Sequence, residues 1–468
     1  MNTSPDSVQA IESHTGALVA LALSTFLAAL AISSVNIALP ALVSSLNTSF
    51  SQVQWITLSY MAVLTATLVI AGRLSDTLGK KRLFAIGVTV FTLAASLAPM
   101  AQNLWQLVIL RGIQGSGAAT MIVVNTAILS DIFPRKRLGA AMGLIGSMSA
   151  IGTGSGPVLG GLLIDHLNWQ AIFWVNLPLG LLVLALAAKH LPEDTVKPLH
   201  RPTATSVLAG SVLFCALVVY TLAARLAGQE IDSTSVWLIL GFVSLLLVFI
   251  YLEIKSDAPL IDLSQLDNKT LFPSLISNFI VSIVAMSSLV IGPFYLTLGL
   301  ELSTSAAGLV MVASPVTVAV TSYLVGRLAQ RFSLERILLS GLLIIALGAS
   351  GMSVLSLSHG LQGFMLGLVV IGSGYATFVS SNNTLTMRDI PAHLRGSVSG
   401  ILNLSRNLGL LTGVALMSAV FDAHSKISAT SVAHLSLDAG VNAVYRLALV
   451  LLAVSVLVQV LFQRKSRR

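Results

Sequence analysis

Long apolar stretches recur along almost the whole chain, and this pattern constrains the fold more than any other feature. A helix needs about 20 apolar residues to cross roughly 30 Å of hydrocarbon. Windows of that length repeat through the 468 residues, of which 55% are hydrophobic and 9% charged, with a mean hydropathy of +0.90. A soluble protein would carry about a quarter charged residues. The sequence therefore predicts an all-α polytopic membrane protein.

We expect fourteen transmembrane helices, because the apolar windows form fourteen groups separated by short connections. They cover residues 16–38, 53–73, 83–101, 105–128, 138–163, 170–189, 205–226, 235–254, 272–297, 305–327, 337–357, 361–382, 398–421 and 443–463. The sequence has no GxxxxGK[ST] phosphate-binding motif, so we do not expect nucleotide hydrolysis by the chain to drive its activity. The first 15 residues hold no Lys or Arg and lack the basic start of a signal peptide.

The placement of Lys and Arg predicts the orientation, because positive residues are retained on the cytoplasmic side. Of the 26 Lys and Arg, 21 follow even-numbered helices or lie in the terminal RKSRR, three lie on the opposite side and two lie within spans. We therefore expect a multi-pass protein of the cytoplasmic (inner) membrane with both termini in the cytoplasm. We attribute the net charge of +8 to the positive residues that fix the membrane topology, so we expect no nucleic-acid partner.

Two short turns indicate an internal repeat. GRLSDTLGKKR, at 72–82, aligns with GRLAQRFSLER, at 326–336, with an offset of 254 residues. Repeated helical bundles are typical of secondary transporters, whose substrate site lies near the midplane between the halves. The predicted organisation is a tail (1–15), a six-helix bundle (16–189), a cytoplasmic loop (190–204), an inserted helix pair (205–254), a cytoplasmic linker (255–271), a second six-helix bundle (272–463) and a basic tail (464–468).

Several motifs, taken in order along the chain, resemble those of one family. The 72–82 turn resembles the helix 2–3 signature of the major facilitator superfamily, RGIQGSGAA (111–119) its helix-4 signature, and GTGSGPVLGG (152–161) the helix-5 signature of its antiporters. Three further segments resemble the fourteen-helix drug/proton antiporter branch: NWQAIFWVNLPLG (168–180), APLIDLSQLDNKTLF (258–272) and RGSVSGILNLSRNLGLLTGVAL (395–416). The resemblance implies the major facilitator fold, with two six-helix bundles plus two additional helices.

The resemblance implies a conformational latch between the bundles in the 72–82 turn. Asp76 is the one acid in a basic turn, and a carboxylate there can accept hydrogen bonds from helix N-terminal N–H groups. The glycines would permit close backbone approach and a tight turn. The latch residues are Gly72, Arg73, Asp76, Gly79, Lys80 and Arg82. The alternative is a solvated basic loop that only sets the topology.

Arg111 is a cation within an apolar helix, which is costly unless the group is paired or faces a wet cavity. Gln114 lies three residues on, so the two share a helix face. By resemblance we expect this pair to tune proton transfer or contact substrate; the alternative is a structural arginine satisfied by carbonyls. Arg406 makes a similar stripe with Asn403.

The 152–161 segment predicts a tight seam. Small residues let helices pack backbone to backbone, and a proline can kink a helix. By resemblance we expect an antiporter-type seam against the other bundle, and the alternative is ordinary small-residue packing. Its residues are Gly152, Gly156, Pro157, Gly160 and Gly161.

The chain lacks the acid that this branch typically carries in its first helix, where Ala31 stands before SSVNIALP. An intramembrane acid attracts cations and holds a proton. Neutral, amphipathic or anionic substrates therefore fit better than dications, and any proton site moves to a helix-end acid: Asp131 or Asp165, with Glu253 the weaker candidate.

Polar residues on several spans are candidates for lining a substrate cavity, although Tyr and Trp at span ends are also typical interfacial anchors. They are Ser33, Asn36, Gln54, Trp55, Tyr60, Asn125, Asn278, Tyr295, Asn382, Asn383, Asn403 and Arg406.

The sequence favours a proton-coupled efflux pump for drugs or amphipathic small molecules, working by alternating access. The alternative is a dedicated exporter of a neutral or anionic metabolite. No histidine lies mid-span and we find no paired carboxylates or HExxH motif, so an enzyme is not expected. A sensor or scaffold is not expected either, because the short loops leave few surfaces for partners. We expect no metal and no cofactor, with a proton gradient as energy source, small molecules and lipid as the partners, and a monomer.

Overall fold

The computed structural model describes residues 5–133, 135–194, 233–255, 271–329, 331–388, 390, 395–425 and 433–466, with isolated positions between 209 and 220. All regular structure in these residues is helical. The elements are α1 (Pro5–Ser45), α2 (Phe50–Val53), α3 (Trp55–Leu78), α4 (Lys80–Leu97), η1 (Ala98–Met100), α5 (Leu104–Ile132), α6 (Arg135–His166), α7 (Ala171–Trp174), α8 (Asn176–His190), α10 (Ser233–Lys255), α11 (Leu271–Phe294), η3 (Tyr295–Gly299), α12 (Thr304–Met311), α13 (Ala313–Leu328), α14 (Leu334–Arg388), α15 (Arg395–Ser425) and α16 (Ala433–Ser466).

Within the described residues, twelve helical stretches are long and apolar enough to span a membrane. Each coincides with one of the fourteen spans expected from the sequence. The expected span 53–73 forms α3, which is not among the twelve and runs on to Leu78. The expected span 205–226 lies largely outside the described residues. Fourteen spans therefore remain a prediction.

The helix ends follow local chemistry. The Asn103 side chain accepts the N–H of Gln106 at 3.0 Å and caps α5. Ser303 caps α12 in the same way, with its Oγ 3.2 Å from the N of Ala306. Such caps satisfy N–H groups that a helix leaves unpaired. The long α14 contains two spans that meet at Gly360, where φ is 50°, a conformation that favours glycine.

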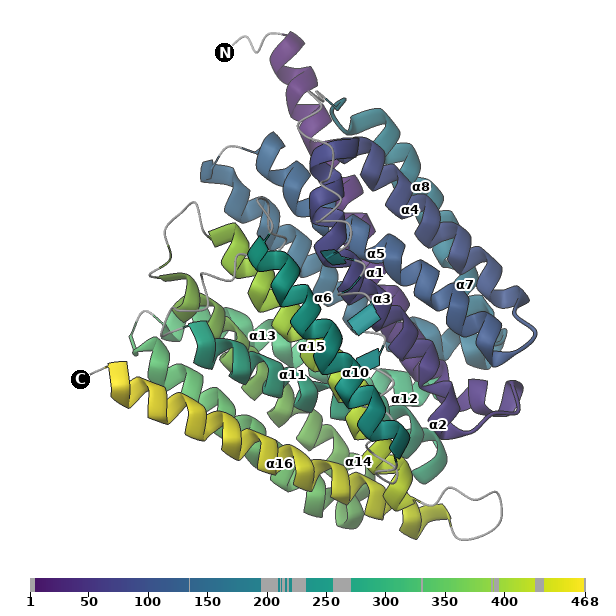
Figure 1. Ribbon diagram of the computed structural model, residues 1–468. Coiled ribbons are helices and arrows are strands. Elements are labelled where there is room, and N and C mark those ends of the chain that lie inside the picture. The colour runs from purple at the N-terminus through teal and green to yellow at the C-terminus, as the bar shows by residue number, and fades with distance from the viewer. Residues whose placement is uncertain are drawn as a thin grey trace. The chain divides into compact units, whose positions relative to one another are not determined.

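The chain divides into two compact units. Unit 1 comprises Met1–Val35, Trp55–Val218 and Leu245–Leu260. Within it α5 is central, because α3 and α4 pack against it and α8 packs on α4. The purple-to-blue helices of Figure 1 show this arrangement. Gly117 allows α4 to approach α5 closely: a Cβ at this position would lie 2.6 Å from the carbonyl oxygen of Gly87.

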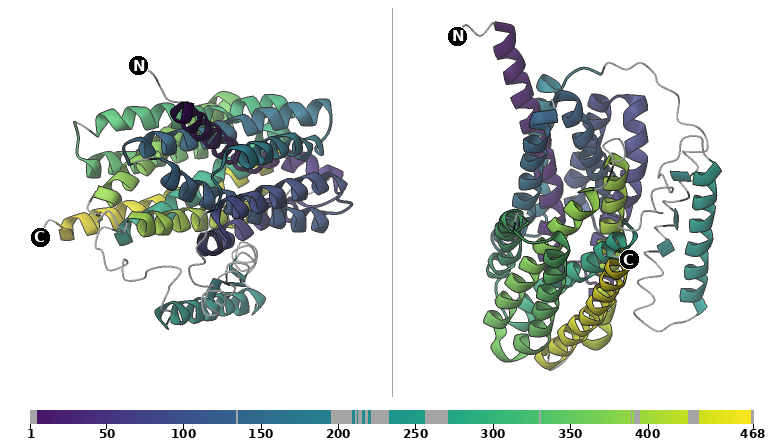
Figure 2. Two further views of the ribbon diagram at one scale, coloured as in Figure 1. Left: turned by 90° about the horizontal axis from the view of Figure 1, so that it is seen from above. Right: turned by 90° about the vertical axis from the view of Figure 1, so that its left-hand side faces the viewer.

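Unit 2 comprises Asn36–Gln54, Val219–Ser244 and Ile261–Arg468. Here α11 packs against α15 and α16, and α14 packs against α13 and α16. Figure 2 shows these green-to-yellow helices from two further directions. Polar pairs are buried between them: the hydroxyls of Ser288 and Tyr445 lie 2.9 Å apart. The Gln459 amide donates to Ser277 Oγ at 3.0 Å.

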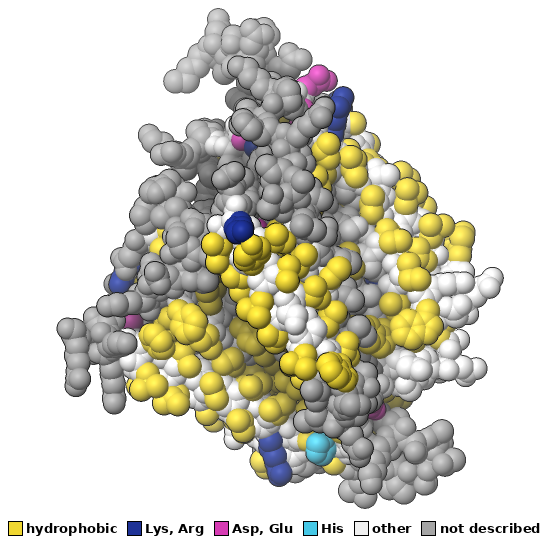
Figure 3. Space-filling model, viewed as in Figure 1, with side chains coloured by type: hydrophobic (Ala, Val, Ile, Leu, Met, Phe, Trp, Pro, Cys, Tyr) yellow, Lys and Arg dark blue, Asp and Glu magenta, His cyan; other side chains and the backbone are white. Residues whose placement is uncertain are grey.

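The outer surface of the described helices is rich in large apolar side chains. Trp237, Ile254 and Leu347 are 71%, 73% and 69% exposed, and on the face in Figure 3 hydrophobic side chains dominate while Lys and Arg occur singly. Soluble monomers rarely expose apolar surface on this scale. Lipid hydrocarbon covers it in a multi-pass membrane protein.

Candidate functional site

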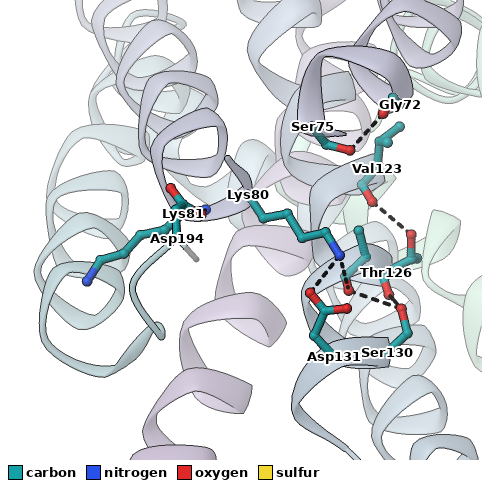
Figure 4. A network of polar contacts seen from close by, with 10 residues as sticks. Gly72, Ser75, Lys80, Lys81, Val123, Thr126, Ser130, Asp131 and Asp194 are labelled. Carbon is teal, nitrogen blue, oxygen red and sulfur yellow. Dashed lines mark hydrogen bonds and ion pairs between the residues drawn. The ribbon is translucent and has the colours of Figure 1, made fainter. Parts of the chain in front are cut away.

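The turn between α3 and α4 is held by two acids from elsewhere in unit 1 (Figure 4). Asp194, just after α8, accepts the backbone N–H of Lys81 with Oδ1 at 2.8 Å and that of Arg82 with Oδ2 at 3.0 Å. These are N–H groups of the first turn of α4, whose own N-cap, Gly79, supplies no side-chain cap. A carboxylate at a helix N-terminus is favoured by the exposed N–H groups and the helix dipole.

Gly79 is required at this turn on two grounds. Its φ is 89°, a conformation that favours glycine. A Cβ there would also lie 2.5 Å from Cγ and Oδ2 of Asp194. Glycine therefore makes the approach of Asp194 to α4 possible.

Lys80 forms the second contact of the turn. Its Nζ lies 2.6 Å from Oδ2 of Asp131, in the last turn of α5, and 3.5 Å from the carbonyl oxygen of Ala127. The two side chains are 29% and 57% exposed. An exposed pair of this kind contributes about 0–1 kcal/mol, so the Asp194 cap is the stronger structural tie.

The other expected latch residues lie differently. Gly72 is inside α3, where its carbonyl oxygen accepts the Ser75 hydroxyl at 2.7 Å. Among the described residues, a Cβ on Gly72 would meet Val123 Cγ1 at 3.9 Å, which is ordinary van der Waals contact; a role of Gly72 in a latch stays a prediction. The side chains of Arg73 and Asp76 lie outside the described residues, and Arg82 is exposed.

Arg111 lies at the centre of unit 1 and is 1% exposed. Its Nη1 donates to Gln114 Oε1 at 2.6 Å, and its guanidinium carbon lies 4.2 Å from the centre of the Tyr60 ring. The Tyr60 hydroxyl reaches the carbonyl oxygen of Ala28 at 3.5 Å. The expected pair of Arg111 and Gln114 is therefore in contact, and α3 and α1 close around it.

The Arg111 guanidinium keeps unused donors. Its Nε and Nη2, and Nε2 of Gln114, have no hydrogen-bond partner among the described residues. Neither of the two ion pairs in the described part of the chain includes Arg111. A buried cation without an anion is costly, and in a membrane segment such a group is a functional-site hypothesis.

Asn125 ties α5 to α1. Its Nδ2 lies 2.9 Å from both Ser24 Oγ and Thr25 Oγ1, and 3.1 Å from the carbonyl oxygen of Leu21. Ser33, expected in the cavity, donates instead to the carbonyl oxygen of Gly152 at 3.2 Å. Both side chains are thus engaged in helix packing within unit 1.

The small residues of α6 pack on α1 of the same unit. A Cβ on Gly152 would lie 2.6 Å from the Phe26 carbonyl oxygen, and one on Gly156 would collide with Ser33. These two glycines therefore make a close contact with α1 within unit 1, and the antiporter-type seam against the other bundle stays a prediction. Pro157, Gly160 and Gly161 are buried on the same helix, and Asp165 is exposed in its last turn.

In unit 2 the structure brings several expected cavity residues together. A cavity of about 230 Å³ lies between α11, α14 and α15, lined by Asn278, Val379, Asn383, Met387, Leu402, Asn403 and Arg406. The Asn278 amide donates to the carbonyl oxygen of Leu402 at 2.9 Å and fixes α11 to α15. The four polar members were predicted from the sequence. The three apolar ones were not, because an apolar residue in a membrane helix does not stand out from its neighbours.

The remaining candidates lie outside that cavity. Asn382 accepts the Ser274 hydroxyl at 2.8 Å. Tyr295 stacks on Phe364 with ring centres 5.2 Å apart. Gln54 is fully buried, and its side-chain amide has no hydrogen-bond partner among the described residues. Asn36 is 1% exposed. The ring of Trp55 lies 6.4 Å from that of Trp105.

No group of three or more His, Cys, Asp or Glu side chains that could hold a metal occurs in the described residues. What the arrangement offers is hydrogen bonding and positive charge inside apolar helices. Such groups bind and orient a polar solute, and nothing here resembles a nucleophile with its base.

Known proteins resemble the chain along most of its length. It is 30% identical over 404 residues to the riboflavin transporter RibZ of Clostridioides difficile (strain 630), covering 86% of this chain and 87% of that protein. It is 32% identical over 422 residues to the multidrug resistance protein Stp of Mycobacterium tuberculosis (strain CDC 1551 / Oshkosh), covering 89% and 77%. A crystal structure of a POT family transporter in complex with 5-aminolevulinic acid shares the fold, with a TM-score of 0.71, 13% identity and 96% of each chain covered.

The family model of the Major Facilitator Superfamily matches residues 21–414. That match spans most of the chain and includes α3 to α14, with the turn, Arg111 and all seven residues that line the unit 2 cavity. The chain is a multi-pass membrane transporter, not an enzyme, and it belongs to the Major Facilitator Superfamily.

Proposed function

We propose that the chain is a proton-coupled exporter of drugs or other amphipathic small molecules, working by alternating access. Relatives that carry the words "multidrug resistance" and "drug efflux pump" in their names support export, at 32% and 29% identity. The proposal includes the fourteen-helix branch, a monomer in the cytoplasmic (inner) membrane, and both termini in the cytoplasm, for which the distribution of 26 Lys and Arg is the support.

The buried Arg111 carries this proposal. A guanidinium with two unused donor nitrogens inside an apolar helix is an expensive feature that helix packing alone does not require. With Gln114 it offers donors to a substrate acceptor or to an anion formed when a proton leaves. The first helix offers no carboxylate to pair with it at the position where this branch typically carries one, because Ala31 stands there.

Asp131 is the acid we assign to the coupled proton. Its carboxylate lies 2.6 Å from the Lys80 ammonium, at the turn that begins α4. It is a helix-end acid in contact with the turn that the resemblance assigns to the latch, which is why we choose it first. Asp165 is the second acid to test, because it lies at the other end of the neighbouring helix α6.

The test is proton movement in everted membrane vesicles held at an established pH gradient. Adding a transported dye should release protons from wild-type vesicles in a saturable manner. The Asp131→Asn variant should bind the dye yet lose at least about 90% of the proton signal, whereas Asp165→Asn should keep it. Dye transport without any proton movement in the wild type would contradict antiport.

A second candidate is a dedicated exporter of one neutral or anionic metabolite. The 30% identity to a riboflavin transporter favours it, as does the position of the acids at span ends. Growth-inhibition profiles of a deletion strain separate the two. Sensitivity to many unrelated compounds supports a drug exporter, and sensitivity to one metabolite supports the dedicated exporter.

A further inference from the structure

The composition of the cavity in unit 2 indicates which class of ligand it can bind. Its seven lining residues come from three helices of one unit: Asn278 from α11, Val379, Asn383 and Met387 from α14, and Leu402, Asn403 and Arg406 from α15. Drug-sized ligands occupy pockets of about 300–1,000 Å³. At about 230 Å³ the cavity has room for part of such a molecule.

The lining carries one charge, and it is positive. Arg406 is the only ionisable residue among the seven. Neither the Lys80–Asp131 nor the Arg388–Glu335 ion pair includes it, and its side chain makes no hydrogen bond among the described residues. Arg406 and Asn403 are three residues apart and share one face of α15. The guanidinium therefore reaches the cavity with its donors available.

The amides of the cavity divide into fixed and available groups. The Asn278 side chain is 3% exposed, and its amide nitrogen is used by the carbonyl oxygen of Leu402. Asn383 is exposed, and its side chain makes no hydrogen bond among the described residues. Asn278 thus holds α11 and α15 in place, while Asn383 and Arg406 present donors to a ligand from α14 and α15.

We propose that this cavity is an anion subsite that takes the carboxylate or phosphate headgroup of an amphipathic molecule. A planar guanidinium pairs with two oxygens of such a group, and the Asn383 amide adds a further donor. Val379, Met387 and Leu402 supply an apolar wall for the adjoining part of the ligand. As the substrate headgroup site, this rests on the proposed export function; the same chemistry could come from a lipid headgroup.

Direct binding tests the subsite independently of transport. The probes are 7-diethylaminocoumarin-3-carboxylate and its uncharged ethyl ester, titrated by fluorescence anisotropy against the purified full chain in detergent. We expect the carboxylate to bind at least tenfold more tightly than the ester. In Arg406→Gln this preference should disappear while ester affinity stays within about twofold. Arg406→Lys should keep part of the preference for the carboxylate, because the positive charge remains but the paired donors of the planar guanidinium are lost.

The matched control is Arg446→Gln, an exposed arginine on α16 that does not line the cavity, and it should keep the full preference. If Arg406→Gln is not monodisperse, Asn383→Leu serves instead and should weaken carboxylate binding at least threefold. Equal affinity of the wild type for both probes, or an unchanged preference in the Arg406 or Asn383 variant, overturns the subsite.

Two further arms identify the source and separate the two proposals. Phosphatidylglycerol that displaces the carboxylate probe, where phosphatidylcholine does not, would make the bound anion a lipid headgroup; lack of displacement would make it a solute. Both results retain the anion subsite. Intact probe binding without dye transport in everted vesicles would refute the exporter function and leave the subsite standing.

Discussion

At residue 79 the chain needs a glycine for its backbone angle and for its neighbour. The φ of 89° is a region that other residues adopt only at a cost of about 1–3 kcal/mol. The contact with Asp194 adds a steric demand, since a Cβ would lie 2.5 Å from the carboxylate. Gly72, seven residues earlier in the same motif, has neither constraint.

We therefore predict opposite results for two alanine substitutions in one motif. Gly79→Ala should destabilise unit 1 by at least about 1–3 kcal/mol. Gly72→Ala, in a helix where the nearest described neighbour of the added Cβ is 3.9 Å away, should be neutral or stabilise by up to about 1 kcal/mol. Thermal unfolding of the purified protein measures both, and equal losses at the two positions would contradict the geometry.

Asp194 gives a second prediction at this scale. Asp194→Ala removes the acceptor for two N–H groups of α4 and should cost about 0.5–2 kcal/mol, the range for N-cap removal. The neighbouring Glu193 is exposed, so Glu193→Ala should change stability by no more than about 0.5 kcal/mol. The thermal midpoint of unfolding is the measurement. A loss in Glu193→Ala as large as in Asp194→Ala would assign the effect to the loss of negative charge.

The residues of this turn show what could be read from the sequence. Gly79 and Lys80 stand out because charge and glycine are concentrated in an apolar chain. Asp194 was missed because its partner Lys81 lies 113 residues away, and an acid after a helix end carries no signal that it caps another helix. The contact between Arg111 and Gln114, by contrast, was predictable, because residues three apart on one helix share a face.

Among the elements, α5 packs closely against α3 and α4 at its glycines. Two glycines of its motif, Gly112 and Gly115, face α3: a Cβ on Gly115 would collide with the Tyr60 carbonyl oxygen and lie 3.1 Å from its carbonyl carbon. A Cβ on Gly112 would lie 3.3 Å from Val63 Cγ2. Close backbone approach at small residues is the usual means of packing membrane helices. It also places the Tyr60 ring over the Arg111 guanidinium.

The fit predicts that Gly115→Ala separates α5 from α3. We expect a loss of stability of about 1–3 kcal/mol, as for overpacking of a core, and loss of transport because Arg111 shifts from Tyr60. The control is Gly143→Ala on α6, where no atom of the described residues lies within 4 Å of the added Cβ, and it should be tolerated. Thermal stability and dye transport in vesicles are the two readouts. Unchanged transport in Gly115→Ala would show that this packing does not position Arg111.

Element boundaries were predictable to the extent that apolarity sets them. The windows gave positions for twelve spans that the described residues confirm, because burial in hydrocarbon selects for length. The partner of a helix face was not predictable. The α6 glycines fit a seam against any neighbour, and only the fold reveals that Gly152 meets Phe26 of α1.

At the scale of the whole chain, the two units share one kind of contact: in each, a buried asparagine hydrogen-bonds a hydroxyl group on a neighbouring helix. In unit 1 Asn125 of α5 bonds the hydroxyls of Ser24 and Thr25 on α1. In unit 2 Asn382 of α14 accepts the hydroxyl of Ser274 on α11. Hydrogen bonds between membrane helices are worth about 0.6 kcal/mol on average, so these ties add modest stability to each unit. Two internally tied units suit a cycle in which each moves as a body.

That cycle predicts that Asn383 is reached from one side of the membrane and then from the other. In a Cys215→Ser background, which removes the chain's one cysteine, Asn383→Cys should react with a membrane-impermeant maleimide. We expect labelling in everted vesicles to fall at least about threefold, and labelling in intact cells to rise, when a transported dye or the opposite pH gradient shifts the populations. Leu347→Cys, on the apolar outer surface of α14, should stay unlabelled from both sides. Labelling of Asn383→Cys from a single side under every condition would rule out alternating access, because a site that never changes sides cannot carry a solute across.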